Sequence, residues 1–215
     1  MDLIQKYFAE FTPMQIRQFS QLETLYKDWN NKINVISRKD IESLYLKHVL
    51  HSLSIAATFD FQPGMEVIDI GAGGGFPSVP LAIFFPQVQF HAVDSINKKL
   101  TVIKEVALGA EITNITTEHI RAEEIKNRKF DVAVSRAVAP LKDLLAWSKP
   151  LLRKPAGRWQ TAIDEGQLVP SGLICLKGGD LAQEIFESGK KPKMWEIYTL
   201  FKEDFFKEKF ILQMN

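Results

Sequence analysis

From position 67 to position 77 the chain reads Val67-Ile68-Asp69-Ile70-Gly71-Ala72-Gly73-Gly74-Gly75-Phe76-Pro77. The first four residues are mostly apolar, as in a buried strand, and four of the next five are glycines. Glycines let the backbone turn sharply and let a ligand approach main-chain N–H groups without a Cβ in the way. Because a plain turn needs only one or two glycines, the stretch predicts a strand followed by a ligand-binding loop.

Downstream, short apolar runs alternate with helical patterns. Expected strands are 66–70, 89–94, 112–116, 131–135, 172–177, 195–201 and 208–213. Expected helices are 79–85, 98–108, 122–126, 141–151 and 181–188. Repeated strand–helix–strand units predict an open, mostly parallel α/β sheet, Rossmann-like, with helices on both faces. The last two strands lack an intervening helical pattern, so we expect them to form an antiparallel hairpin at one edge.

The first third of the chain has helical spacing. Thr12-Pro13-Met14-Gln15 offers an N-cap, a proline at the first helical position and a glutamine at N3, which predicts a helix ending near 30–31. A second helix is expected from about 37 to 58. We therefore expect residues 1–62 to form a helical extension packed on a cofactor-binding domain, residues 63–215, in one compact unit.

Composition limits the classes of function. A net charge of +1 and a pI of about 7.8 are not typical of a protein that coats nucleic acid, so any RNA contact must be local. The apolar stretches fall short of the ~20 residues that span a bilayer, and no basic-then-apolar leader precedes them. We expect a cytoplasmic monomer that does not bind membranes. His48 and His51 share a helix face but lack further ligands, so no metal site is expected.

A carboxylate follows the glycine loop at the spacing of a nucleoside site. Asp94 ends the second strand, 94 − 71 = 23 residues after Gly71, where it can accept hydrogen bonds from a ribose diol. Gly71, Gly73 and Gly75 are the expected loop contacts to the cofactor. A dinucleotide fingerprint needs glycine at its sixth position, which here is Phe76. The register favours S-adenosylmethionine, which has no phosphate, over a nicotinamide cofactor.

Several motifs in order resemble one family. The 67–77 stretch is followed by Asp94-Ser95, Ser135-Arg136-Ala137 and Leu176-Lys177-Gly178, and preceded by Asn34-Val35-Ile36-Ser37 and Lys47-His48-Val49-Leu50. This combination is similar to the glucose-inhibited division protein B family, whose members are class I methyltransferases acting on guanine N7 of small-subunit ribosomal RNA. The resemblance covers about residues 25 to 180. It matches nothing in 155–169, whose role stays open.

The resemblance implies roles for particular residues. Gly71 and Phe76 would line the cofactor site, Ala122 and Glu123 would contact the adenine, and Asp94 would hold the ribose. Arg136 would lie beside the methionine end and face the target base of the rRNA or 30S subunit. The chain departs from the family at His51, Gly74 and Ser78, which bears on the shape of the pocket mouth.

The chemistry of guanine N7 agrees with the residues at the end of the fourth expected strand. N7 carries a lone pair and no proton, so its methylation needs orientation and electrostatics but no general base. The chain has Ser135-Arg136-Ala137-Val138 here, without the Asn-Pro-Pro-aromatic of amino methyltransferases or the Pro-Cys of cytosine-C5 enzymes. Arg136 can bind guanine O6, phosphate or the cofactor carboxylate, unless it forms a surface ion pair.

Two further residues have open roles, and two further functions stay open. His48 and Lys177 are candidate RNA contacts, with packing and ordinary solvation as their alternatives. The chain could instead be a class I methyltransferase for a different acceptor, or a nicotinamide- or RNA-binding module without methyl transfer.

Overall fold

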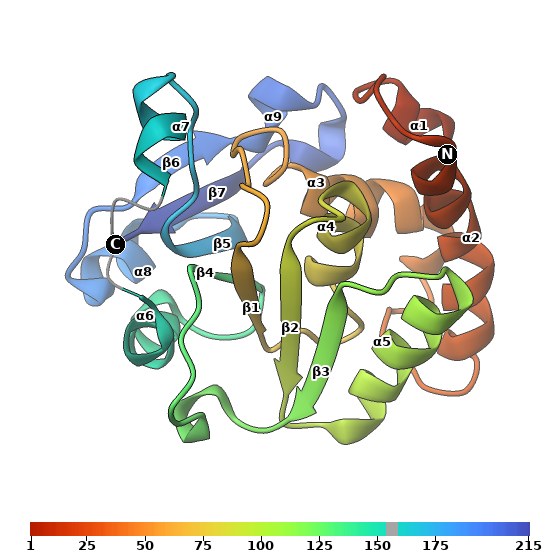
Figure 1. The fold of residues 1–215 in the computed structure, drawn as a ribbon, viewed down its shortest axis with the longest axis horizontal. Coiled ribbons are helices and arrows are strands. Elements are labelled where there is room, and N and C mark those ends of the chain that lie inside the picture. The colour runs from red at the N-terminus through yellow and green to blue at the C-terminus, as the bar shows by residue number, and fades with distance from the viewer. Residues whose placement is uncertain (154–158) are drawn as a thin grey trace.

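A computed structural model describes residues 1–153 and 159–215. Within them, seven strands form one sheet in the order β3-β2-β1-β4-β5-β7-β6 (Figure 1). The strands are β1 (Glu66–Ile70), β2 (Gln89–Asp94), β3 (Ile115–His119), β4 (Val132–Arg136), β5 (Gly172–Gly178), β6 (Lys193–Glu196) and β7 (Lys209–Met214). The first five run parallel, whereas β7 pairs antiparallel with both β5 and β6. The expected open α/β sheet with an antiparallel edge is confirmed.

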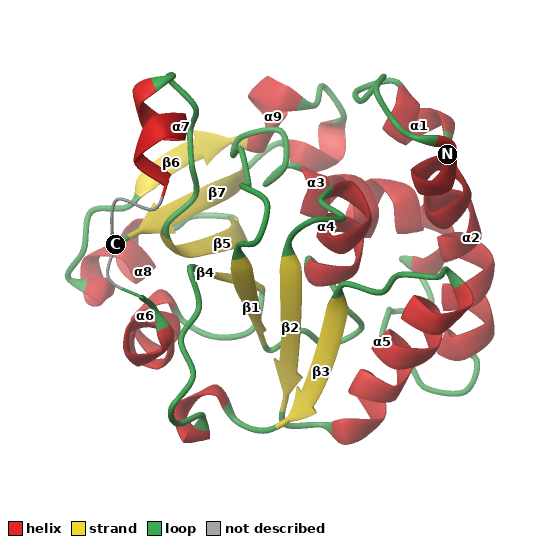
Figure 2. Ribbon diagram, viewed as in Figure 1, coloured by secondary structure: helices red, strands yellow, loops and turns green. Residues whose placement is uncertain are grey.

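Helices cover both faces of the sheet (Figure 2). The α-helices are α1 (Asp2–Gln5), α2 (Pro13–Asn30), α3 (His51–Leu53), α4 (Ser78–Phe84), α5 (Asn97–Gly109), α6 (Leu141–Ser148), α7 (Gln160–Asp164), α8 (Ala182–Ser188) and α9 (Ile197–Leu200). Successive residues of β1 serve opposite cores, because side chains alternate along a strand. Val67 packs in the core that includes residues of α2, α4 and α5, and Ile68 in the one that includes residues of α6. Among the helices that the structure describes, none combines the length and the apolar character that a membrane span needs.

Two predicted strands differ from the structure by more than one residue at an end. The third is Ile115–His119 instead of 112–116. Just before it, the buried Asn114 side chain donates to the carbonyls of Ala82, Phe85 and Val88, which ties this residue to the α4 side of the sheet. The expected strand 195–201 is wrong in its second half, which is α9. Its buried residues, Ile197 and Phe201, recur at helical spacing. The edge hairpin therefore contains a helix between its strands.

The helix predicted from 37 to 58 is broken into shorter pieces. A 3-10 turn (Ile41–Ser43) leads into a π-helix (Tyr45–Leu50) and then into α3. π turns leave the regular α-helical ladder, and here the Lys47 carbonyl accepts a hydrogen bond from Arg136 Nη1 at 3.2 Å. Of the segment 155–169, residues 155–158 lie outside the described part of the chain and the rest includes α7.

α2 begins and ends as the sequence predicts. Thr12 and Gln15 form the capping box: the Gln15 N–H donates to Thr12 Oγ1 at 3.2 Å, and the Thr12 N–H donates to Gln15 Oε1 at 3.0 Å. On the buried face of α2, Tyr26 donates its hydroxyl hydrogen to the Gly74 carbonyl at 2.7 Å. Its ring also packs on Phe76 with 4.8 Å between centroids. α2 thus holds the glycine loop directly.

Replacing Tyr26 by phenylalanine would leave the Gly74 carbonyl without its donor in a buried place. We expect Tyr26→Phe to lower the free energy of unfolding by ~1–3 kcal/mol. For a chain of this size that corresponds to a Tm decrease of roughly 2–4 °C per kcal/mol, measurable by calorimetry. Tyr198→Phe is the control, because within the described residues the Tyr198 hydroxyl has no hydrogen bond and its ring lies below Lys202. Equal effects of the two variants would contradict the prediction.

Candidate active site

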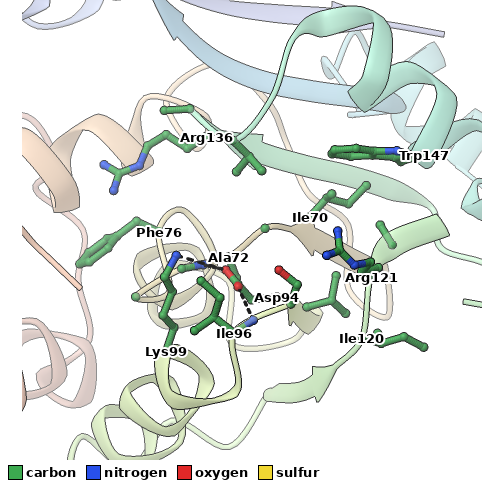
Figure 3. A pocket seen from close by; sticks show the side chains of 18 of the residues that line it. Ile70, Ala72, Phe76, Asp94, Ile96, Lys99, Ile120, Arg121, Arg136 and Trp147 are labelled. Atoms are coloured by element: carbon green, nitrogen blue, oxygen red, sulfur yellow. Dashed lines mark hydrogen bonds and ion pairs between the residues drawn. The ribbon is translucent and has the colours of Figure 1, made fainter. Parts of the chain in front are cut away.

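A cavity of about 390 Å³ opens at the carboxyl ends of β1, β2 and β4 (Figure 3). It has the size of small-molecule sites, which begin near 300 Å³. Of the residues predicted to contact the cofactor, seven line it: Gly71, Gly73, Phe76, Asp94, Ala122, Glu123 and Arg136. The wall also contains residues for which the sequence predicted no cofactor contact, among them Val35, Ile96, Lys99, Arg121, Val138 and Trp147. Helical and loop residues of this kind carry no spacing signal in the sequence.

The glycines of the loop serve two different purposes. Gly71 has φ +69°, and a Cβ at this position would stand 2.5 Å from Val138 Cγ1. The segment after β4 can therefore pack against the glycine loop only because Gly71 has no side chain. Gly75, predicted to touch the cofactor, does not line the cavity. A Cβ on Gly75 would stand 2.6 Å from Val79 Cγ2 and 3.2 Å from the Tyr26 hydroxyl, so this glycine permits helix packing behind the loop.

The Asp94 carboxylate joins the ends of two strands. Its Oδ2 accepts the Gly73 N–H at 3.0 Å, and its Oδ1 accepts the Ile96 N–H at 2.9 Å. The Lys99 ammonium lies 4.0 Å from Oδ2, and Asp94 is only 7% exposed. Figure 3 shows the carboxylate at the cavity wall. Because each carboxylate oxygen has two lone pairs, Asp94 shapes the loop and can still accept hydrogen bonds from a ligand.

A second carboxylate is buried beneath the glycine loop. Asp69 Oδ2 accepts the Ser78 N–H at 3.1 Å, whereas Oδ1 has no partner among the described residues. Loss of hydration raises the pKa of Asp69 to about 6. Ser78, one of the three departures from the family, is fully buried at the start of α4 and does not line the cavity.

Arg136 ends β4 and is held without a carboxylate partner in the described residues. Its Nη2 lies 2.9 Å from His48 Nδ1, its Nη1 donates to the Lys47 carbonyl, and its guanidinium stands 5.1 Å from the centre of the Phe76 ring. Burial lowers the pKa of Arg136 to about 10, so it remains charged near neutral pH. The surface ion pair considered from the sequence does not form among these residues.

His48 is the neutral partner of that arginine. Burial, and then the charge of Arg136, lower the pKa of His48 to about 3. Arg136 has only donors, so His48 Nδ1 is the acceptor and the ring proton is assigned to Nε2, which has no partner among the described residues. A neutral imidazole therefore orients the guanidinium without neutralising its charge.

A second cavity, of about 870 Å³, adjoins the first. Both are lined by Arg136, Ala137 and Val138, so Arg136 stands between them. His48 and His51 also line the second cavity. Here burial lowers the pKa of His51 well below its usual value.

Lys177 lines the second cavity but is largely covered. Its ammonium donates to the Ala139 carbonyl and to Glu184 Oε1, both at 2.6 Å. Glu184 also accepts the Leu141 N–H at 2.7 Å. Lys177 and Glu184 thus hold the segment after β4 in place.

Neither a metal-binding cluster nor a reactive thiol is found in the part of the chain that the structure describes. Residues 1–153 and 159–215 contain no group of three or more His, Cys, Asp or Glu side chains that could hold a metal ion. Cys175 is fully buried in β5, and burial raises the pKa of its thiol to about 12, so it is not poised as a nucleophile.

Comparison with solved structures supports the fold. A SAM-dependent methyltransferase from Aquifex aeolicus matches with a TM-score of 0.50 at 14% identity, over 82% of this chain and 97% of that one. The 16S rRNA methyltransferase RsmC of T. thermophilus, in complex with AdoMet and guanosine, also has a TM-score of 0.50, at 13% identity, over 82% of this chain and 42% of that one. At such identities the likeness concerns the fold alone.

Sequence comparison identifies the family. The family model described as rRNA small subunit methyltransferase G matches residues 15–162. A protein of that name from Phocaeicola vulgatus is 50% identical over all of this chain and 98% of its own length, and one from Bacteroides fragilis is 49% identical over 100% of both. The resemblance inferred from the motifs is confirmed. The chain belongs to the rRNA small subunit methyltransferase G (GidB) family.

Proposed function

We propose that this S-adenosylmethionine-dependent methyltransferase transfers a methyl group to N7 of a guanine in small-subunit (16S) ribosomal RNA. The observation that carries the proposal is the arrangement of two adjoining cavities that meet at Arg136, a partly buried cation without an ion-paired carboxylate in the described residues. The acceptor is rRNA, naked or in the 30S subunit, and this substrate fits a cytoplasmic enzyme that works as a monomer.

The first cavity fits the cofactor. Gly71 and Gly73 place side-chain-free backbone on the cavity wall, Phe76 offers an apolar wall, and Asp94 has lone pairs for the ribose besides the one that binds the Gly73 N–H. We assign the adenine end to Ala122 and Glu123, which line the cavity beyond the end of β3. When bound, S-adenosylmethionine supplies an electrophilic methyl group. The unpartnered Asp69 Oδ1 adds a buried acceptor behind the loop.

In our proposal the second cavity takes the guanine. N7 attacks with its own lone pair, so the chain's task is to orient the base and stabilise its charge distribution. The free donors of Arg136 suit guanine O6 or a neighbouring phosphate, because donating to N7 would block the attack. His48 orients Arg136, and its neutrality avoids a second positive charge beside a cationic cofactor. With its present partners, Lys177 affects the acceptor site indirectly, by holding the segment 137–140 in place. It would contact rRNA directly only if the rRNA displaced Glu184.

The test is label transfer followed by mapping. Purified protein is incubated with labelled S-adenosylmethionine and with 30S subunits or deproteinised 16S rRNA, and N7-methylguanine is located by borohydride–aniline cleavage. We expect label in rRNA at one cleavage site. Label confined to protein or to a small molecule would overturn the proposal in favour of a class I methyltransferase with another acceptor.

Asp94 provides a test of the cofactor site. Asp94→Ala removes a charged acceptor and releases the Gly73 and Ile96 N–H groups, so we expect the Kd for S-adenosylhomocysteine to rise about 10- to 100-fold, or ~1.5–3 kcal/mol. Asp131→Ala is the control, since this aspartate binds the Glu66 N–H at the opposite end of the sheet. Calorimetric titration that finds the same Kd in Asp94→Ala and wild type would show that another acid holds the ribose.

His48 tests the positioning of Arg136. His48→Leu removes the acceptor, whereas an asparagine oxygen can take the place of Nδ1. We expect His48→Leu to lower kcat at least about tenfold, because small misplacements near reacting atoms are costly, with His48→Asn recovering most of the loss. The Kd for S-adenosylhomocysteine should change little in either variant. Equal kcat values for the leucine and asparagine variants would count against the positioning role.

A further inference from the structure

A third hollow, of about 470 Å³, lies beside the cofactor cavity and has no part in the chemistry described above. It is formed where α2 ends and the following segment turns back. Its wall includes Asn31, Lys32, Asn34 and Arg38, together with the Lys27–Glu42 ion pair. We call it the 27–42 groove. In Figure 1, α2 and the segment after it end at the lower side of the molecule, toward which β2 and β3 also point.

The groove is positively charged. Glu42 is bound by Lys27 at 2.9 Å. By contrast, neither Lys32 nor Arg38 forms an ion pair with any carboxylate in residues 1–153 and 159–215. Lys32 is held over the Trp29 ring at 4.2 Å, which leaves its ammonium donors free. Two unneutralised cations with amide side chains beside them suit a phosphodiester backbone and its bases.

The groove is also built rigidly against the cofactor loop. Asn30 Oδ1 accepts the N–H groups of Val35 and Ile36, and its amide donates to the Ile36 carbonyl, each at 2.9 Å. Val35 lines the cofactor cavity and approaches Gly74 so closely that a Cβ there would stand 3.0 Å from it. Asn34, which lines the groove, immediately precedes Val35 in the chain, so the wall of the groove continues directly into the wall of the cavity.

The proposed reaction itself limits which form of RNA can enter. N7 lies on the major-groove edge of guanine, and the major groove of an RNA helix is too deep and narrow for protein side chains. The target must therefore be unpaired, and the strand that continues from it needs a surface near the mouth. We propose that the 27–42 groove binds this single-stranded rRNA segment flanking the target guanine, with Lys32 and Arg38 on its phosphates. The inference rests on the proposed function.

The experiment removes two positive charges from the groove and, in a control variant, two positive charges from a distant surface. Lys32→Gln with Arg38→Gln is measured beside Lys190→Gln with Lys191→Gln, which removes two exposed cations near β6, at the opposite edge of the sheet from β3. For the groove variant we expect the KM for deproteinised 16S rRNA to rise about tenfold. The slope of log KM against log salt should fall by about 1.4, because each single-strand phosphate contact contributes about 0.7. The control should match wild type.

Further measurements separate the possible failures. The Kd for S-adenosylhomocysteine and the Tm should stay at wild-type values, and Lys32→Arg with Arg38→Lys should keep the rRNA KM low. Fluorescence anisotropy with an unstructured oligoribonucleotide on the order of 10 nucleotides reports binding without catalysis. If the wild-type protein methylates rRNA but the groove and control variants have equal KM values, the groove inference is overturned. If the wild-type protein binds the oligonucleotide but does not methylate rRNA, the proposed function is overturned and the groove inference is not.

Discussion

The hold of the Asp94 carboxylate on two main-chain N–H groups is the interaction on which the site depends. A short loop of glycines has little conformational preference of its own, so its shape must come from outside. Asp94 supplies this from one side through Gly73, and Tyr26 supplies it from the other through Gly74. The cofactor cavity therefore has a defined form only when α2, β1 and β2 are all in place.

Arg136 connects this cavity to the acceptor side. An arginine that is largely taken out of water usually has a carboxylate partner, but a backbone carbonyl and a neutral imidazole hold the partly buried guanidinium of Arg136. Its charge is therefore available to a ligand. The 27–42 groove has a similar arrangement: the Trp29 ring holds the Lys32 ammonium in place without neutralising its charge.

Much of the fold and part of the site could be predicted from the sequence. β1 and β2 have the predicted bounds because apolar runs and glycines mark them, and the spacing from Gly71 marks Asp94. Other features depend on distant partners. Asn114, just before β3, donates to carbonyls more than 25 residues away, the packing of Val79 and Tyr26 requires Gly75, and Lys177 donates to the Ala139 carbonyl. Local pattern alone does not contain these contacts.

The π-helix Tyr45–Leu50 makes the length of this segment matter for the site. A π turn closes its hydrogen bond one residue further along the chain than an α turn does. Losing one codon between 45 and 50 would restore the regular pitch and turn the His48 ring by roughly a quarter of a revolution, away from Arg136. The direction of the His48 ring therefore depends on the number of residues in this segment as well as on their identity.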